Sequence, residues 1–269
     1  MIRKLLASTT MALSLVSFSQ AVQANAISYE AAVLGDNPLA YWKLDELTGS
    51  TAIDSVGGFN GTISGDTSVG SSGAFSGSSS YSFDGNGDYV EISTGTWGGG
   101  SSLTVEAWYN LNSAGSTFQS VVSALTADFA HLQVYTAGNN VAYTNGGVIV
   151  LPIASPIPLN EWHHLVMSIS SGDTRLYRDG VQIGSSSVTF TSINPTGVIR
   201  FGSGYAGGRY LSGRIDDIAI YDSALSESQV QAHFSAASAV AAVPEPGIIT
   251  LLGIGIAGLG FRRRKKFNS

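Results

Sequence analysis

The acidic residues of this sequence have the clearest potential for chemistry. Only seven of the 269 residues are glutamates. Hydrolysis of a glycosidic bond uses two carboxylates, about 5 Å apart in a retaining mechanism and farther apart in an inverting one. Glu106 is the best single candidate, because it shares a predicted strand face with Trp108 and can line a groove there. The alternative is a carboxylate on a sheet face that bonds to a neighbouring strand or to water.

Two pairs of adjacent residues, Asp216-Asp217 and His163-His164, suggest a base or metal role. Neighbouring residues of a strand point to opposite faces, so we expect neither pair to act as a facing pair. No second cluster of ligands at zinc spacing accompanies the histidines. Because the sequence has no cysteine and no Gly-x-Ser-x-Gly motif, a nucleophilic triad has no support either.

The charge balance limits the partners of the central part of the chain. Residues 27–242 hold six basic and eighteen acidic residues, so their net charge is −12, whereas the whole chain has −6. Nucleic acid and anionic lipid need positive charge to neutralise phosphate, and we exclude both as partners. The acidity is compatible with calcium, which takes six to eight oxygen ligands. The alternative is that the acidity only keeps an exported protein soluble.

The N-terminal segment, residues 1–26, has the order of a secretory signal peptide. Arg3 and Lys4 precede an apolar stretch over residues 5–18, and Ala24-Asn25-Ala26 supplies the small residues that signal peptidase reads. We expect cleavage after Ala26, with cleavage after Ala24 as the alternative. A retained membrane helix is disfavoured because the apolar run is short. Since cysteine is absent, no disulfide framework supports the exported chain.

The C-terminal segment, residues 243–266, has three parts. Val243-Pro244-Glu245-Pro246 precedes an apolar run of fifteen residues, 247–261, and a basic block over 262–266. The prolines end the preceding element, and the basic block prefers the cytoplasmic side of a membrane. A helix of fifteen residues reaches roughly 22 Å, less than the ~30 Å hydrocarbon core. We therefore predict a temporary transmembrane anchor, with an ordinary tail anchor as the alternative.

This order of parts resembles the PEP-CTERM sorting signal of Gram-negative bacteria, with Pro244, Glu245 and Pro246 as the motif. The resemblance implies an exosortase-type processing enzyme as a partner, in addition to signal peptidase. It also implies a transient inner-membrane anchor, followed by location at the cell surface or in the extracellular matrix.

The body of the chain, residues 27–236, alternates between apolar and polar residues. Clusters of Gly, Ser, Asn and Asp interrupt the alternation roughly every 8–12 residues, which predicts one β-sandwich or barrel domain. Tight turns are expected at residues 171–173 and 179–180, a mobile loop at 68–80 and a linker at 237–242. Short helices are expected at residues 28–34 and 226–234. The clearest strands are expected at 81–83, 89–92, 103–111, 121–124, 132–135, 147–151, 162–169, 175–178, 181–183, 198–201 and 213–221.

Seven blocks of this body resemble, in order, those of a LamG-like jelly roll of the concanavalin A-like lectin/glucanase superfamily. The blocks are NPLAYWKLDE, AIDS, YSFDG, LTVEAW, WHHLV, LYRDG and GRIDDIAIY, which begin at residues 37, 52, 81, 103, 162, 176 and 213. The resemblance implies an all-β fold, a two-sheet antiparallel jelly-roll sandwich over residues 27–236. Residues 113–160 are the part that it covers least.

The resemblance also implies candidate site residues. Many LamG-like domains hold one calcium ion at the rim of the sandwich, and by position Asp54, Asn60 and Asp216 are the candidate ligands. The alternative is an Asx-turn at Asp54 and a strand-end cap at Asp216. The resemblance further implies that His164 packs beside Trp162. The Glu-x-Asp-x-x-Glu arrangement of jelly-roll hydrolases is missing from the sequence.

Carbohydrate binding uses exposed aromatic rings that stack on sugars. Trp97, Tyr205 and Tyr210 lie in or beside predicted loops and are the candidate ligand-binding residues, although a loop tyrosine can also cover the edge of the core. We predict an exported, non-catalytic surface or matrix protein that binds a glycan, such as an exopolysaccharide, or a matrix protein. The alternative is a carbohydrate-active hydrolase of the same fold with an unrecognised site. A purely structural component fits the sequence equally well.

Overall fold

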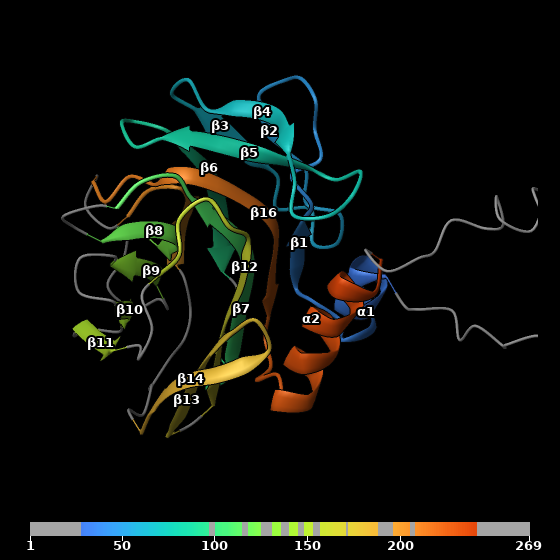
Figure 1. Ribbon diagram of the computed structural model, residues 1–269, viewed down its shortest axis with the longest axis vertical. Coiled ribbons are helices and arrows are strands. Elements are labelled where there is room, and N and C mark those ends of the chain that lie inside the picture. The colour runs from blue at the N-terminus through green and yellow to red at the C-terminus, as the bar shows by residue number, and fades with distance from the viewer. Residues whose placement is uncertain are drawn as a thin grey trace, which may run out of the picture.

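The computed structural model shows two antiparallel sheets face to face, with two helices on the outer face of one of them (Figure 1). It describes residues 28–96, 100–114, 118–124, 131–135, 140–144, 148–152, 157–170, 172–187, 196–204 and 208–240. The predicted signal peptide and sorting signal lie outside these residues. Within the described ranges, no helix is long and apolar enough to cross a membrane.

The described residues form two sheets of eight strands, and every expected strand is present. The first sheet has the order β14-β13-β12-β7-β16-β5-β4, and β1 also pairs with β16. Its strands are β14 (Val181–Ser186), β13 (Asp173–Arg178), β12 (His163–Ser170), β7 (Leu103–Leu111), β16 (Ser212–Tyr221), β5 (Ser79–Asp84), β4 (Ser68–Ser72) and β1 (Ala40–Trp42). The second sheet is formed, in order, by β11 (Val148–Pro152), β10 (Asn140–Thr144), β9 (Leu132–Tyr135), β8 (Gln119–Ala124), β15 (Thr196–Phe201), β6 (Tyr89–Thr96), β3 (Gly61–Ser64) and β2 (Thr51–Ala52).

Strand β7 shows how alternation separates two packed layers. Val105, Ala107 and Tyr109 point inward, into the core between the sheets. Trp108 points outward, and it is buried because the helices cover this face. Both faces of β7 are therefore inaccessible to water, although only one faces the second sheet.

The two helices lie side by side on the outer face of the first sheet (Figure 1). Helix α1 (Tyr29–Gly35) was expected, and Ser28 caps it by accepting a hydrogen bond from the amide of Ala31. Helix α2 (Glu227–Val240) is longer than expected and includes residues 237–240 of the predicted linker. The physical reason is that Ala237 is buried in this layer, and alanine favours helix.

One turn and one loop test the local predictions. The expected turn at Asp179-Gly180 joins β13 to β14, and its φ values of 54° and 75° are those of a hairpin turn with two left-handed residues. The predicted mobile loop at residues 68–80 is wrong, because it contains β4 and the start of β5. Pairing with β5 gives this Gly- and Ser-rich segment its backbone partners.

The expectation that Asp216 and Asp217 point to opposite faces is also wrong. Asp216 pairs with Trp108 and Ala219 pairs with Glu106, so β16 has one residue more than β7 between these pairs. This is a β-bulge, in which Asp217 takes a φ of 45°. The extra residue interrupts the alternation, so both carboxylates contact the outer, helix-covered layer.

Candidate functional site

The structure places Glu106 in a closed polar network and not in a groove. The Glu106 side chain is fully buried. Its Oε1 accepts a hydrogen bond of 2.5 Å from the hydroxyl of Tyr221, and its Oε2 lies 3.1 Å from His164 Nε2 and 3.0 Å from His233 Nδ1. Burial alone would raise the pKa of Glu106, but the hydrogen bonds from the two histidines outweigh it and lower the pKa to about 2.

His233 extends this network from the sheet to both helices. Its Nδ1 faces Glu106, and its Nε2 lies 3.0 Å from Asp36 Oδ2 at the C-terminal cap of α1. Burial alone would lower the pKa of His233. The carboxylates of Glu106 and Asp36 outweigh this effect, so the pKa lies above its ordinary value. His233, with one ring nitrogen on each of two carboxylates, therefore connects α2, α1 and β7.

His164 and Trp108 seal the other side of the network. The His164 ring stacks on Trp108 with a centroid distance of 5.1 Å, and Phe234 of α2 stacks on Trp108 at 6.0 Å. The main aromatic partner of His164 is thus Trp108, although the resemblance implied Trp162. His163 points elsewhere, with Nδ1 2.7 Å from Asp179 Oδ2. These histidines orient backbone and core groups, and they share no arrangement for metal binding within the described residues.

The pair Asp216-Asp217 is the second buried group of carboxylates on this face. Asp216 accepts hydrogen bonds from the amide of Ala74 at 2.8 Å and the hydroxyl of Ser78 at 3.1 Å. Asp217 accepts one from the hydroxyl of Tyr41. Burial raises the pKa of Asp216 to about 7. Burial and the neighbouring Asp216 raise the pKa of Asp217 as well.

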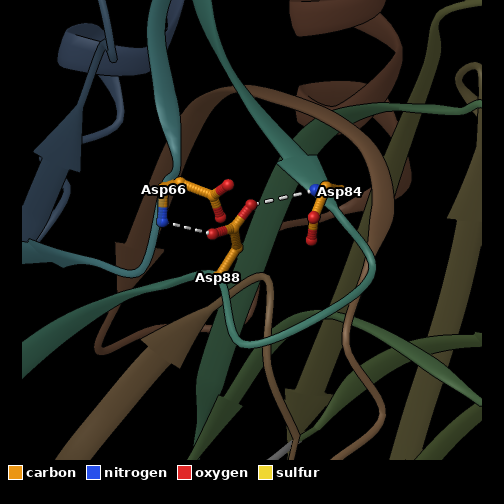
Figure 2. A group of neighbouring side chains, drawn as sticks. All are labelled: Asp66, Asp84 and Asp88. Carbon is orange, nitrogen blue, oxygen red and sulfur yellow. Dashed lines mark hydrogen bonds between the residues drawn. The ribbon is translucent and has the colours of Figure 1, made fainter.

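A third group, Asp66, Asp84 and Asp88, can hold a metal ion (Figure 2). One ligand atom from each residue lies within 4.8 Å of the others. The buried Asp88 carboxylate accepts hydrogen bonds from the amides of Asp66 at 2.8 Å and Asp84 at 3.0 Å, as Figure 2 shows. The side chains of Asp66 and Asp84 are exposed. Oxygen atoms of this kind are the ligands that hard cations prefer.

Glycine makes this aspartate group possible. Gly65 has a φ of 75°, and a Cβ at this position would collide with Asp88 Oδ1. Gly85 and Gly87 have φ values of 91° and 83° in the turn that brings Asp84 to Asp88. This Asp-Gly-Asn-Gly-Asp segment is the turn between β5 and β6. Asp84 and Asp88, at the two ends of this turn, were the available sequence signal for a cation site, which was not among the predicted sites.

The three calcium ligands predicted from the resemblance do not form one group. Asp54 accepts hydrogen bonds from the amides of Tyr41, Val56 and Phe59 at 2.8, 3.0 and 2.9 Å. Asn60 accepts one from the amide of Asp54 at 2.9 Å. Asp216 instead binds the segment around residues 74–78. These contacts support the Asx-turn alternative for Asp54, and the role of the three residues as ligands stays a prediction.

Of the three aromatic residues predicted to bind sugar, one lies within the described ranges. Trp97 and Tyr205 lie outside the described residues. Tyr210, which precedes β16, is half-buried. Their role in binding therefore stays a prediction.

Comparisons with known proteins identify the family of this sandwich. The family of concanavalin A-like lectin/glucanases matches residues 84–231, more than half of the chain. The chain belongs to this superfamily. The PEP-CTERM protein-sorting motif matches residues 242–265 and confirms the predicted motif. It implies an exported, cell-surface protein that an exosortase processes. No curated protein matches the chain.

Solved structures agree with the lectin/glucanase fold. Domain 4 of AbnA, a GH43 extracellular arabinanase from Geobacillus stearothermophilus in complex with arabinotriose, matches with a TM-score of 0.56 and 19% identity, over 74% of this chain and 98% of that one. The binding domain of Paraclostridial Mosquitocidal Protein 1 matches with a TM-score of 0.59 and 17% identity, over 75% of this chain and 52% of that one. Trypanosoma rangeli sialidase matches with a TM-score of 0.55 and 11% identity, over 72% of this chain and 32% of that one. At these identities the matches show the fold alone.

Proposed function

We propose that this lectin/glucanase-like chain is a non-catalytic binding protein of the cell surface or extracellular matrix, with a glycan or a matrix protein as its ligand. The PEP-CTERM motif supports export and sorting. The closed network around Glu106 supports the proposal that the protein is non-catalytic, because Glu106 is the best hydrolytic candidate of the sequence.

A catalytic carboxyl group must reach the substrate, and a general acid must also hold a proton near neutral pH. Glu106 is fully buried, its oxygens face Tyr221, His164 and His233, and its pKa of about 2 keeps it ionised. It therefore has neither the access nor the proton.

Asp216 and Asp217 are the second catalytic candidate, because both carboxyl groups have raised pKa values. Asp217 lines a cavity of about 230 Å³, smaller than the roughly 300–1,000 Å³ of ordinary ligand pockets. Asp216 is completely buried and already binds the 74–78 segment. The small cavity and the engaged Asp216 favour binding without turnover.

Two features guide the choice of ligand. Domain 4 of AbnA was solved with arabinotriose, which makes oligosaccharides the first class to test. The aspartates Asp66, Asp84 and Asp88 supply a second feature, and we assign calcium to them because carboxylate oxygens suit this ion. The acidic body argues against polyanionic ligands.

The test uses the exported, processed protein on a polysaccharide array, with and without a chelator. We expect binding to at least one neutral glycan and no reducing-sugar release from the same panel. Glu161→Gln is a matched control, because the Glu161 side chain is 68% exposed. Sugar release that is lost in Glu106→Gln or Asp217→Asn, with the fold intact, would establish the hydrolase instead.

A further inference from the structure

A cavity of about 230 Å³ lies where the described chain begins. Its walls come from the first residues of α1, from β1 and the segment after it, from the 75–78 loop, from the bulge of β16 and from α2. Ser28, the first described residue, is one of the lining residues. The cavity is therefore next to the point where the predicted signal peptide joins the domain.

The lining of this cavity is acidic. Glu30, Asp45 and Asp217 contribute carboxylates, and Lys43 is the basic residue among them. Lys43 Nζ lies 3.3 Å from Glu30 Oε2 and 3.6 Å from Asp45 Oδ2, so its charge is already shared by two carboxylates. Within the described ranges, no basic side chain forms an ion pair with Asp217.

Burial and Asp216 raise the pKa of Asp217 more than the charge of Lys43 lowers it, so the charge of this carboxylate is compensated only in part. Its side chain accepts one hydrogen bond, from Tyr41, and the residue is only 5% exposed. The neighbouring Asp216 Oδ1 is buried and has no hydrogen-bond partner among the described residues. Buried carboxylates are costly unless a positive charge or hydrogen bonds compensate them. Asp217, which lines the cavity, thus points to a cation there.

We propose that the α-ammonium group of Ile27, which signal peptidase creates by cleavage after Ala26, occupies this cavity and pairs with Asp217. The inference rests on the export in the proposed function. Ile27 directly precedes Ser28 of the cavity wall. One residue spans at most about 3.5 Å, so an ammonium group at Ile27 is within reach, whereas cleavage after Ala24 leaves it two residues farther away.

Charge and proximity favour this occupant over other cations. An ammonium group has three N–H donors and a single charge, which suits one unpaired carboxylate. Calcium and magnesium ions take six or more ligands, and Lys43 in the wall would repel them. An amine from solution competes poorly, because the chain terminus has a high effective concentration at the cavity. In the precursor, the same nitrogen is an uncharged amide, so the ion pair forms only after export.

The pairing makes a part of the stability depend on pH. An α-ammonium group has an ordinary pKa of about 7.7–8.0, and Asp217 raises it. The stabilisation is complete below the ordinary value and is lost as the pH rises through the raised one. The other titratable groups that face Asp217 are Tyr29, Glu30, Tyr41, Lys43, Asp45 and Asp216.

The experiment measures how fast the N-terminal amine reacts. The full chain is exported from a Gram-negative host with its own signal peptide, and intact mass identifies the first residue. A short acylation pulse near pH 7, followed by peptide mapping, then compares wild type with Asp217→Asn. Since an opposite charge shifts a pKa by roughly 1–3, we expect Ile27 to react at least about tenfold more slowly in wild type. Asp222→Asn is the control, because Asp222 is an exposed aspartate that follows β16.

A second variant does not disturb the buried pair. Insertion of Gly-Ser between Ala26 and Ile27 moves the ammonium group away from the cavity, and we expect its N-terminal amine to react as fast as that of Asp217→Asn. Equal rates in wild type, Asp217→Asn and the insertion variant would overturn the cavity pairing and leave export intact. A mature mass that does not begin at Ile27 would overturn the proposal at the cleavage step, and a mass that still includes Met1 would count against export itself.

Discussion

Replacement of Glu106 by glutamine removes the charge at the centre of the network between β7 and the two helices. The network lowers the pKa of Glu106 from 4.5 to about 2. Each pKa unit corresponds to about 1.4 kcal/mol, so the folded state favours the ionised carboxylate by roughly 3 kcal/mol. Glutamine keeps the volume but cannot accept charge-assisted hydrogen bonds from both His164 and His233. We expect Glu106→Gln to lower the free energy of unfolding at pH 7 by about 2–3 kcal/mol.

The sign of the pH dependence follows from the lowered pKa. The stabilisation by Glu106 is present above the unfolded value of 4.5 and is lost as the pH falls toward about 2. Wild type should therefore lose stability through this acid range, whereas Glu106→Gln should lose roughly 3 kcal/mol less.

Urea unfolding followed by tryptophan fluorescence measures both quantities at neutral pH and at about pH 3, where about 2 kcal/mol of the roughly 3 kcal/mol is already lost. Glu161→Gln is the matched control and should behave as wild type, since its exposed carboxylate lies 3.9 Å from His163. A Glu106→Gln protein within about 0.5 kcal/mol of wild type at pH 7, with the same acid loss, would refute the stabilising role of the network.

Three further predictions concern the turns and the other carboxylates. Gly65→Ala should cost at least about 2 kcal/mol more than Gly58→Ala in thermal unfolding, because both glycines have a φ near 75° (75° and 78°) but only Gly65 adjoins Asp88; equal losses would contradict the close approach. Calcium at a hundredfold excess over Kd should stabilise the protein by about 2.7 kcal/mol, and Asp66→Asn or Asp84→Asn should abolish the gain. An unchanged melting temperature between chelator and calcium would exclude the aspartate site, and loss of the gain in Asp54→Asn would favour the rim site instead. Burial raises the pKa of Asp216 from 3.8 to about 7, so stability should decline as the pH rises from about 4 to about 7 and level off above that, and Asp216→Asn should flatten the decline; identical pH curves for the two proteins would contradict it.

The sequence alone determined the fold class and the order of its parts. Alternation within single strands is a local property, and it predicted β7, β12 and β16 with little error. The turn at Asp179-Gly180 and the cap at Ser28 were predictable for the same reason, because their geometry depends on a few neighbouring residues. The PEP-CTERM motif is also contiguous, and the family comparison confirms it.

The tertiary structure decided what surrounds each acidic side chain. The pattern around Glu106 indicates which face of the strand it occupies, but not that His233, 127 residues away, covers that face from a helix. Asp36 and His233 are 197 residues apart, and no local pattern connects them. The bulge at Asp217 is likewise set by pairing with β7, and it reversed the predicted orientation of one carboxylate. Periodicity encodes the direction of a side chain along a regular strand, whereas burial and pKa depend on distant segments that only the assembled fold brings together.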